Sequence, residues 1–172
     1  MIKLIGAILL VGGAAAFGMS GVFRLRGRCG SLAAVTHALG IMQSEICDKL
    51  TPMPELLGQL SQEAEYPASQ LFKNAEEKMS SLGGGSSFAM IWRQAVSITP
   101  ELMLTGDEQA VLYELGLSLG RYNADEQKNA LQYARRRMEE YARRADLTRE
   151  NNTKLHACLG VAAGIFAVVI LI

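Results

Sequence analysis

Residues 105–145 decide the fold class, and they read TGDEQAVLYELGLSLGRYNADEQKNALQYARRRMEEYARRA. Two capping boxes begin helices here, at Thr105–Glu108 and Asn123–Glu126, because in each the first and fourth side chains can satisfy each other's backbone donors. Apolar residues follow each box at intervals of three and four, which is the period of one helix face. They are Val111, Leu112, Leu115 and Leu119, then Leu131, Ala134, Met138, Tyr141 and Ala145. The stretch therefore predicts two amphipathic helices, with Gly120 ending the first.

The same signals predict four more helices upstream. An apolar stripe from Leu32 to Leu50 follows Ser31, a residue type that favours the N-cap. The sequence Thr51-Pro52-Met53-Pro54-Glu55 ends that helix and starts the next, because proline is favoured in a first turn and Thr51 can cap it. Tyr66-Pro67 and Gly83-Gly84-Gly85 separate the second, third and fourth helices. No sustained period-two alternation indicates a strand, so we expect an all-α, six-helix antiparallel bundle.

Two long uncharged stretches flank this helical region. Leu4–Phe23 holds 20 residues without a charge and Ala157–Ile172 holds 16. At 1.5 Å per residue the first spans about 30 Å, the thickness of the apolar core of a bilayer. We therefore expect transmembrane helices at residues 1–23 and 155–172, the second continuous with the last helix, around a central domain at residues 24–154.

Basic residues lie on the inner side of both uncharged stretches. They are Arg24, Arg26 and Arg28 after the first stretch, and Arg143, Arg144, Arg149 and Lys154 before the second. Under the positive-inside rule both flanks belong on the cytoplasmic side. The three cysteines form no C-x-x-C pair, which agrees with a reducing compartment. We expect a cell-membrane protein anchored at both ends, with its central domain in the cytoplasm.

An alternative interpretation of the first stretch is a secretory signal peptide. Ala14-Ala15-Ala16 supplies a cleavage site of the A-x-A kind, and cleavage there would release a secreted helical protein. The uncharged stretch continues past this site, however, and the arginines that follow favour retention in the membrane.

Small residues recur four apart within both expected anchors. Gly160 and Gly164 form a G-x-x-x-G motif, and Gly12 and Ala16 have the same spacing. Helices in lipid associate where small residues let their backbones approach closely. We therefore expect Gly12, Ala16, Gly160 and Gly164 to pack membrane helices, on each other or on those of a partner.

The charge is zero overall but unevenly distributed. Between Glu45 and Glu126 there are thirteen acidic residues and five basic ones. Such an acidic region is either a solvated face or a docking surface for a basic partner. The candidates for a docking surface are Glu63, Glu65, Glu76 and Glu77, which fall on the second and third helices or just after.

Residues that could support catalysis are few. His37 falls off the apolar stripe of its helix, which indicates a surface side chain, and the other histidine is His156. No G-x-S-x-G, H-E-x-x-H or P-loop motif occurs. Gly83-Gly84-Gly85 lacks the lysine and the preceding strand of a phosphate-binding loop. We expect no enzyme activity, no metal and no cofactor; the alternative is a membrane-bound regulator or enzyme that uses the glycine loop.

The arginine run Arg135-Arg136-Arg137 does not favour nucleic-acid binding. Glu139 and Glu140 follow within one turn and stand four residues before Arg143 and Arg144, a spacing that forms ion pairs on a helix. Aromatic residues interleaved for base stacking are also lacking. We expect a salt-bridged helix face and no nucleic-acid partner.

Several short stretches together resemble the stage III sporulation protein AB family of endospore-forming bacteria. The resemblance begins at Met1-Ile2-Lys3-Leu4-Ile5-Gly6-Ala7 and ends in the C-terminal apolar helix, so it covers nearly the whole chain. The stretches between are Glu45-Ile46, Thr51-Pro52-Met53-Pro54-Glu55, Trp92, Leu115-Gly116, Leu119-Gly120, and Asp125 with Gln127. Their order and spacing carry the resemblance, since no single one is specific.

The resemblance implies a structural role for six residues, namely Thr51, Pro52, Pro54, Gly116, Gly120 and Gln127. It implies a six-helix domain similar to the cytoplasmic domain of type II secretion F-type platform proteins. It also implies a role in the channel apparatus that links mother cell and forespore, facing the mother-cell cytoplasm near a secretion-type ATPase. The partners it implies are other membrane proteins of that complex, with membrane lipid around them.

Overall fold

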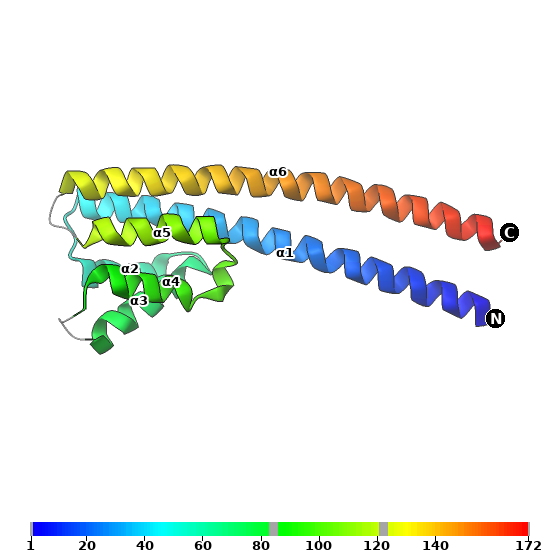
Figure 1. The fold of residues 1–172 in the computed structure, drawn as a ribbon, viewed down its shortest axis with the longest axis horizontal. Helices are drawn as coiled ribbons and strands as arrows, with labels where there is room; N and C mark the ends of the chain where they lie inside the picture. Colours follow the sequence, from blue (N-terminus) through cyan, green and yellow to red (C-terminus); the bar gives the residue numbers. More distant parts are fainter. Residues whose placement is uncertain (1, 83–85, 121–123, 172) are drawn as a thin grey trace. The chain divides into compact units, whose positions relative to one another are not determined.

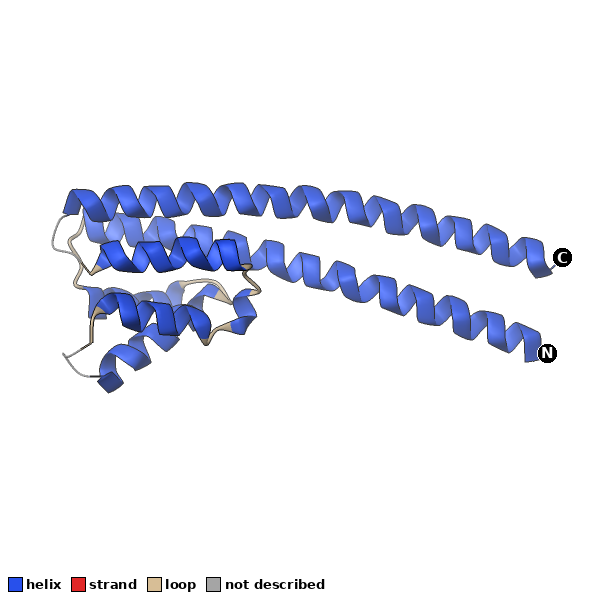
Figure 2. Cartoon of the chain, in the orientation of Figure 1, coloured by secondary structure: helices blue, strands red, loops and turns tan. Residues whose placement is uncertain are grey.

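The computed structural model describes the backbone of residues 2–82, 86–120 and 124–171, and the side chains of residues 25–81, 86–120 and 124–150. Over this part the chain forms six α-helices, one short 3₁₀ helix and no strand (Figure 2). They are α1 (Ile2–Cys47), α2 (Met53–Glu63), α3 (Ala68–Leu82), α4 (Phe88–Ser97), η2 (Pro100–Leu102), α5 (Gly106–Leu119) and α6 (Ala124–Leu171). The prediction of an all-α protein with six helices is confirmed.

The chain divides into two compact units. The core unit is Arg28–Arg143, and the terminal unit combines Met1–Gly27 with Arg144–Ile172. Where the structure describes the chain, it contains no helix that combines the length and the apolar character needed to cross a membrane. The two predicted spans, residues 1–23 and 155–172, lie outside the residues whose side chains are described.

The core unit is built around large apolar side chains contributed by every one of its helices. Trp92 and Phe72 are the largest of those that are almost fully buried. Within the core unit α2 packs on α3, α3 on α4, and α4 on α5 (Figure 1). Four of the five apolar residues predicted to line α6 are buried, namely Leu131, Ala134, Met138 and Ala145, and Tyr141 is half-buried. Helical periodicity therefore identified the buried face of α6 correctly. Leu50, predicted to end the apolar stripe of the first helix, instead lies beyond the end of α1 and is 74% exposed.

α1 runs through Ser31 without a break, so the predicted helix start at this residue is wrong. Gly27 and Gly30 each weaken a helix by about 1 kcal/mol but do not block its hydrogen bonds as proline does. Ser31 is 2% exposed, and its hydroxyl donates to the carbonyl of Glu101 at 3.4 Å. The side chain read as a cap instead joins two segments far apart in sequence.

The predicted cap at Thr51 is also wrong, although a helix does start at the proline pair. The N-cap of α2 is Pro52, which makes no side-chain capping bond, and Pro54 lies in the first turn. Thr51 donates from Oγ1 to the carboxylate of Glu45 at 2.8 Å. Its hydroxyl is therefore engaged by α1 and not by the helix that follows.

The start of α5 and the length of α6 agree with prediction. Glu108 accepts a hydrogen bond from the backbone N–H of Thr105 at 2.7 Å, as the capping box requires, and Gly120 is the C-cap of α5. α6 is continuous over 48 residues. The second capping box begins at Asn123, and the glycine loop covers residues 83–85; both lie outside the described residues.

Candidate functional site

Gly116 is required by the close approach of α4 and α5. A Cβ atom at this position would lie 2.5 Å from Cδ1 of Trp92 and 3.0 Å from its Cγ. Real Cβ atoms essentially never approach a neighbour that closely, so a side chain here would displace the indole or the helix. The absence of a side chain at Gly116 therefore lets α5 pack closely against Trp92 of α4.

Trp92 cannot readily give way. Its side chain is fully buried, and Nε1 donates to the carbonyl of Leu112 at 2.8 Å. The ring lies 5.8 Å from that of Phe72 and 5.9 Å from that of Phe88, in the range where aromatic pairs attract. The indole is held on three sides, and the backbone of Gly116 closes against it.

Two further family-motif residues lie at the junction between α5 and α6. Gly120 ends α5 with an ordinary φ of −81°, and a Cβ there would meet Cβ of Phe88 at 3.5 Å. Gln127, in the first turn of α6, donates from Nε2 to the carbonyl of Leu119 at 3.4 Å. Gln127 therefore satisfies a carbonyl at the helix end that the α5 ladder leaves unpaired.

At the end of α1 a buried carboxylate organises the turn into α2. Glu45 is 6% exposed and accepts from Nζ of Lys49 at 2.6 Å and from Oγ1 of Thr51 at 2.8 Å. The hydrogen bond from Lys49, followed by that from Thr51, holds the pKa of Glu45 below its ordinary value. Leu50 lies between these partners in the left-handed region with φ 56°. We refer to residues 45–51 as the α1–α2 corner.

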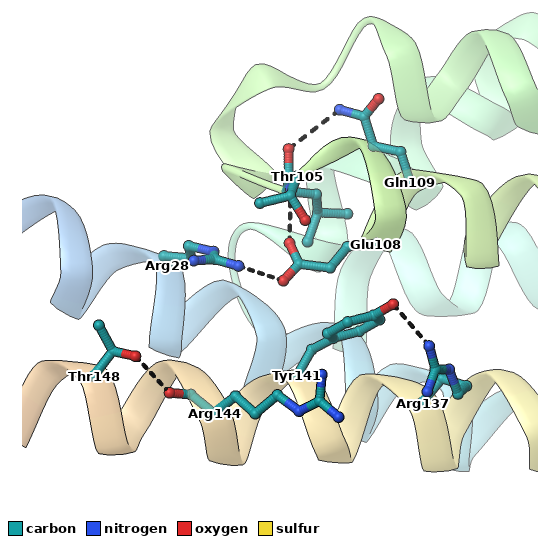
Figure 3. Close-up of polar contacts among 9 residues, drawn as sticks. Arg28, Thr105, Glu108, Gln109, Arg137, Tyr141, Arg144 and Thr148 are labelled. Atoms are coloured by element: carbon teal, nitrogen blue, oxygen red, sulfur yellow. Dashed lines mark hydrogen bonds and ion pairs between the residues drawn. The ribbon is translucent and has the colours of Figure 1, made fainter.

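A second buried carboxylate lies at the start of α5. Glu108 is completely buried, and one oxygen accepts from Nη2 of Arg28 at 2.5 Å while the other accepts from the Thr105 backbone (Figure 3). The Arg28 side chain is 31% exposed. Arg28 is the first residue of the core unit, so this ion pair fastens α1 to α5 where α1 enters that unit.

The four acidic candidates do not all gather in one place. Glu76 and Glu77 line a shallow groove between α2 and α3, together with Ser61, Gln62, Lys73 and Ser80. Glu63, which accepts from Gln59 at 3.0 Å, and Glu65 are exposed but do not line that groove. A docking surface that uses all four would extend beyond the groove to the end of α2.

The charged face of α6 pairs differently from the predicted pattern. Glu139 accepts from Arg135 and Glu140 from Arg137, each at 3.0 Å, in place of the expected pairs with Arg143 and Arg144. Arg137 also donates to the hydroxyl of Tyr141, and its guanidinium lies 5.1 Å from that ring's centroid (Figure 3). Both glutamates therefore pair with arginines on their N-terminal side.

His37 is exposed, as predicted. It lines an open groove between α1 and α6 with Ala33, Gly40 and Arg135. Among the described residues no group of three or more histidine, cysteine or acidic side chains is placed to hold a metal ion. The four residues expected to pack membrane helices, Gly12, Ala16, Gly160 and Gly164, lie outside the residues whose side chains are described.

Sequence reasoning missed the pair of Arg28 and Glu108. In the sequence Arg28 belongs to a basic flank of the first uncharged stretch, and Glu108 belongs to a capping box. Eighty residues separate them, so no periodic signal links the two. Glu108 alone could have indicated a further partner, because its capping bond occupies only one of its two carboxylate oxygens.

Comparisons with known proteins agree with the resemblance in the sequence. A search of curated proteins found no match. A solved structure of a stage III sporulation protein AB has the same fold, with a TM-score of 0.66 and 22% sequence identity over 73% of this chain and 98% of that one. The family model described as stage III sporulation protein AB matches residues 3–172. This chain therefore belongs to the stage III sporulation protein AB family.

Proposed function

We propose that the protein is a non-catalytic assembly component of the channel apparatus between mother cell and forespore, anchored in the cell membrane at both ends. The observation that carries this proposal is the family match over residues 3–172, which includes both long uncharged stretches as well as the helical core. The basic flanks of those stretches support a central domain on the cytoplasmic side.

The roles of the polar side chains in the core unit support assembly over chemistry. Glu45, Thr51 and Glu108 each satisfy a partner from a neighbouring turn or helix. Trp92 and Gly116 set the spacing of two helices. These groups are engaged in holding the fold, and a rigid bundle of this kind suits a platform on which other proteins assemble.

The proposed partners follow from charge and position. Other membrane proteins of the channel would meet the anchors through Gly12, Ala16, Gly160 and Gly164, where small residues permit close helix contact. A basic surface, such as one on a secretion-type ATPase, would meet the acidic side chains Glu63, Glu65, Glu76 and Glu77. Membrane lipid surrounds the anchors, and no nucleic acid is involved.

The test is to recover the full chain from membranes of sporulating cells after crosslinking, and to identify what accompanies it by mass spectrometry. We expect other channel proteins in wild type and a reduced set with Gly164→Ile, because a large side chain at a close crossing separates the helices. Gly30→Ala is the matched control, since a Cβ at Gly30 meets nothing within 4 Å. An unchanged set with Gly164→Ile would show that the glycine spacing is incidental.

The same preparation distinguishes the alternatives. A mature chain that begins at Phe17 on N-terminal sequencing would establish a secreted protein and overturn the platform proposal. Shortening Gly83-Gly84-Gly85 to two residues should leave sporulation intact if these residues only connect α3 with α4. Loss of sporulation with an unchanged melting temperature would favour a regulator or enzyme that uses the glycine loop.

A further inference from the structure

Helices α4 and α5 share an exposed surface that is apolar in its middle. The two helices pack against each other (Figure 1), and Met90 on α4 and Leu117 on α5 are 53% and 60% exposed. Tyr113 of α5 is half-buried, and the guanidinium of Arg93 of α4 lies over its ring, 5.0 Å from the centroid. We call Met90, Arg93, Tyr113, Glu114 and Leu117 the α4–α5 surface. Exposed apolar side chains that share a surface bordered by charges are typical of a protein–protein contact.

The surface carries one cation and one acid, and neither has an ion-pair partner within the part of the chain that the structure describes. Arg93 is the only basic residue between positions 86 and 120, and its contact is with the ring of Tyr113. Glu114 is exposed on α5. Water solvates an exposed charge, so the lack of a partner alone indicates nothing. The order of the charges across the surface carries the argument.

The two charges lie on opposite sides of the apolar middle. Residues three and four apart are neighbours on a helix, so Leu117 lies beside both Glu114 and Tyr113. Successive residues are about 100° apart around the helix, so Tyr113 and Glu114 face different sides of Leu117. Tyr113 is on the side of α4, where Arg93 covers it, and Glu114 is therefore on the far side. The order across the surface is cation, apolar middle, acid.

We propose that the α4–α5 surface is a contact between two copies of this chain, related by a two-fold axis that runs along α5 at Leu117. This axis places Arg93 of each copy opposite Glu114 of the other, and Leu117 against its own counterpart. An axis across α5 would instead oppose Arg93 to Arg93 and Glu114 to Glu114, and like charges repel. The order of the charges therefore selects a parallel pairing of the two α5 helices.

This inference goes beyond the proposed function and does not depend on it, because every residue of the surface belongs to the core unit. Only one face of two short helices takes part, so the interface belongs to the small class that forms transient pairs. Such a pair is best detected by crosslinking, since it dissociates on dilution during size measurements.

The experiment uses the full chain in membranes, with Cys29, Cys47 and Cys158 replaced by alanine and a single Leu117→Cys. Tyr133→Cys is the matched control, because Tyr133 is also a large, half-exposed side chain (50%) of a helix in the core unit. The membranes are oxidised with copper phenanthroline. We expect several-fold more product of twice the chain mass from position 117 than from position 133, because the axis brings the two copies of residue 117 together.

Charge reversal then tests the pairing itself. Arg93→Glu or Glu114→Arg in the Leu117→Cys chain opposes like charges across the contact, so each should lower the yield several-fold. Coexpression of the two reversed chains, carrying tags of different size, should restore the product as the mixed pair, because both opposite-charge contacts return. Melting temperatures check the fold, and Glu114→Arg leaves the contact of Arg93 with Tyr113 untouched.

Four outcomes would overturn the proposal. Equal yields at positions 117 and 133 would mean that crowding in the membrane alone brings chains together. A product at position 117 of a mass other than twice the chain would assign the surface to a different protein. An undiminished yield with either single reversal, or no mixed product on coexpression, would show that Arg93 and Glu114 do not meet between copies.

Discussion

The core unit holds a buried carboxylate at each of two places, and the two are paired differently. One has partners close in sequence, and the other has a partner far away in sequence. At the α1–α2 corner the buried Glu45 is paired by Lys49, one turn away and 63% exposed, and by a threonine of the following loop. At the start of α5 the buried Glu108 is paired by Arg28, eighty residues away, and by the backbone of a threonine that precedes it. The first arrangement is local and fixes a turn, whereas the second is long-range and fixes α1 to α5. Equal burial of a carboxylate therefore does not mean an equal role.

Removing the cation at each end gives the largest expected difference. Arg28→Met should destabilise the protein by about 3 kcal/mol, because it leaves a completely buried carboxylate without its cation. Lys49→Met should cost clearly less, since Lys49 is mostly exposed and Thr51 remains on Glu45. Thermal unfolding of the full chain in detergent measures both.

A double substitution checks the reason for that difference. Arg28→Met with Glu108→Met removes both charges and should recover part of the loss, because no unpaired buried charge remains. Equal losses for Arg28→Met and Lys49→Met would show that the long-range pair is no more important than the local one.

A substitution at the contact between α4 and α5 should lower the stability of the whole core unit and leave both carboxylate pairs in place. Gly116→Ala should cost about 2 kcal/mol, because the added Cβ overlaps Trp92, which is buried and hydrogen-bonded. Gly120→Ala is the control and should change stability by less than about 0.5 kcal/mol, since the added Cβ makes only ordinary contact. Denaturant unfolding distinguishes the two, and equal effects would mean that the α4–α5 contact relaxes freely.

The pH dependence should isolate the α1–α2 corner. The bond from Lys49, and then that from Thr51, lowers the pKa of Glu45 below its ordinary value of 4.5. Its ionised form therefore adds stability fully above about pH 4.5, and this is lost as the pH falls through the lower, folded-state pKa. The gap in melting temperature between wild type and Glu45→Gln should thus narrow on acidification. Glu55→Gln, at an exposed site, is the control for the general effect of losing a carboxylate. If the difference in melting temperature between wild type and Glu45→Gln widened on acidification, the lowered pKa of Glu45 would be contradicted.

The smallest effect on stability is expected at the acidic candidates, which lie on α2, just after it, and on α3. Changing Glu63, Glu65, Glu76 and Glu77 to glutamine should alter stability by less than about 0.5 kcal/mol per site. If they dock a basic partner, capture of the membrane complex should fall at low salt and approach wild type at high salt. The control changes four exposed acids elsewhere to their amides, Glu55, Glu101, Asp107 and Glu126. Equal capture by both variants and wild type would leave the acids as a solvated face.

Local features of the fold were predictable and long-range ones were not. Apolar periodicity identified the buried side of α6, and the Thr105–Glu108 box identified the start of α5, because both depend on residues within one or two turns. The cap predicted at Thr51 failed because Glu45 from the preceding helix competed for its hydroxyl.

The polar contacts of the core unit could not be predicted either, because their partners are far away in sequence. A serine at position 31 fits a cap in sequence, yet its hydroxyl bonds Glu101, seventy residues away. The η2 turn at Pro100–Leu102 and the pair of Arg28 with Glu108 belong to this class as well. Hydroxyl and charged groups have several possible partners, and which partner wins depends on tertiary packing.

The contact of Trp92 with Gly116 has a consequence for how this family can diverge. The indole fills the space that a methyl group at position 116 would need, so the two positions share one fixed volume. Neither can change alone without a vacancy or an overlap. Relatives with alanine or serine at the position of Gly116 should therefore carry a smaller ring or an aliphatic residue at that of Trp92, and the two substitutions should be inherited as a pair.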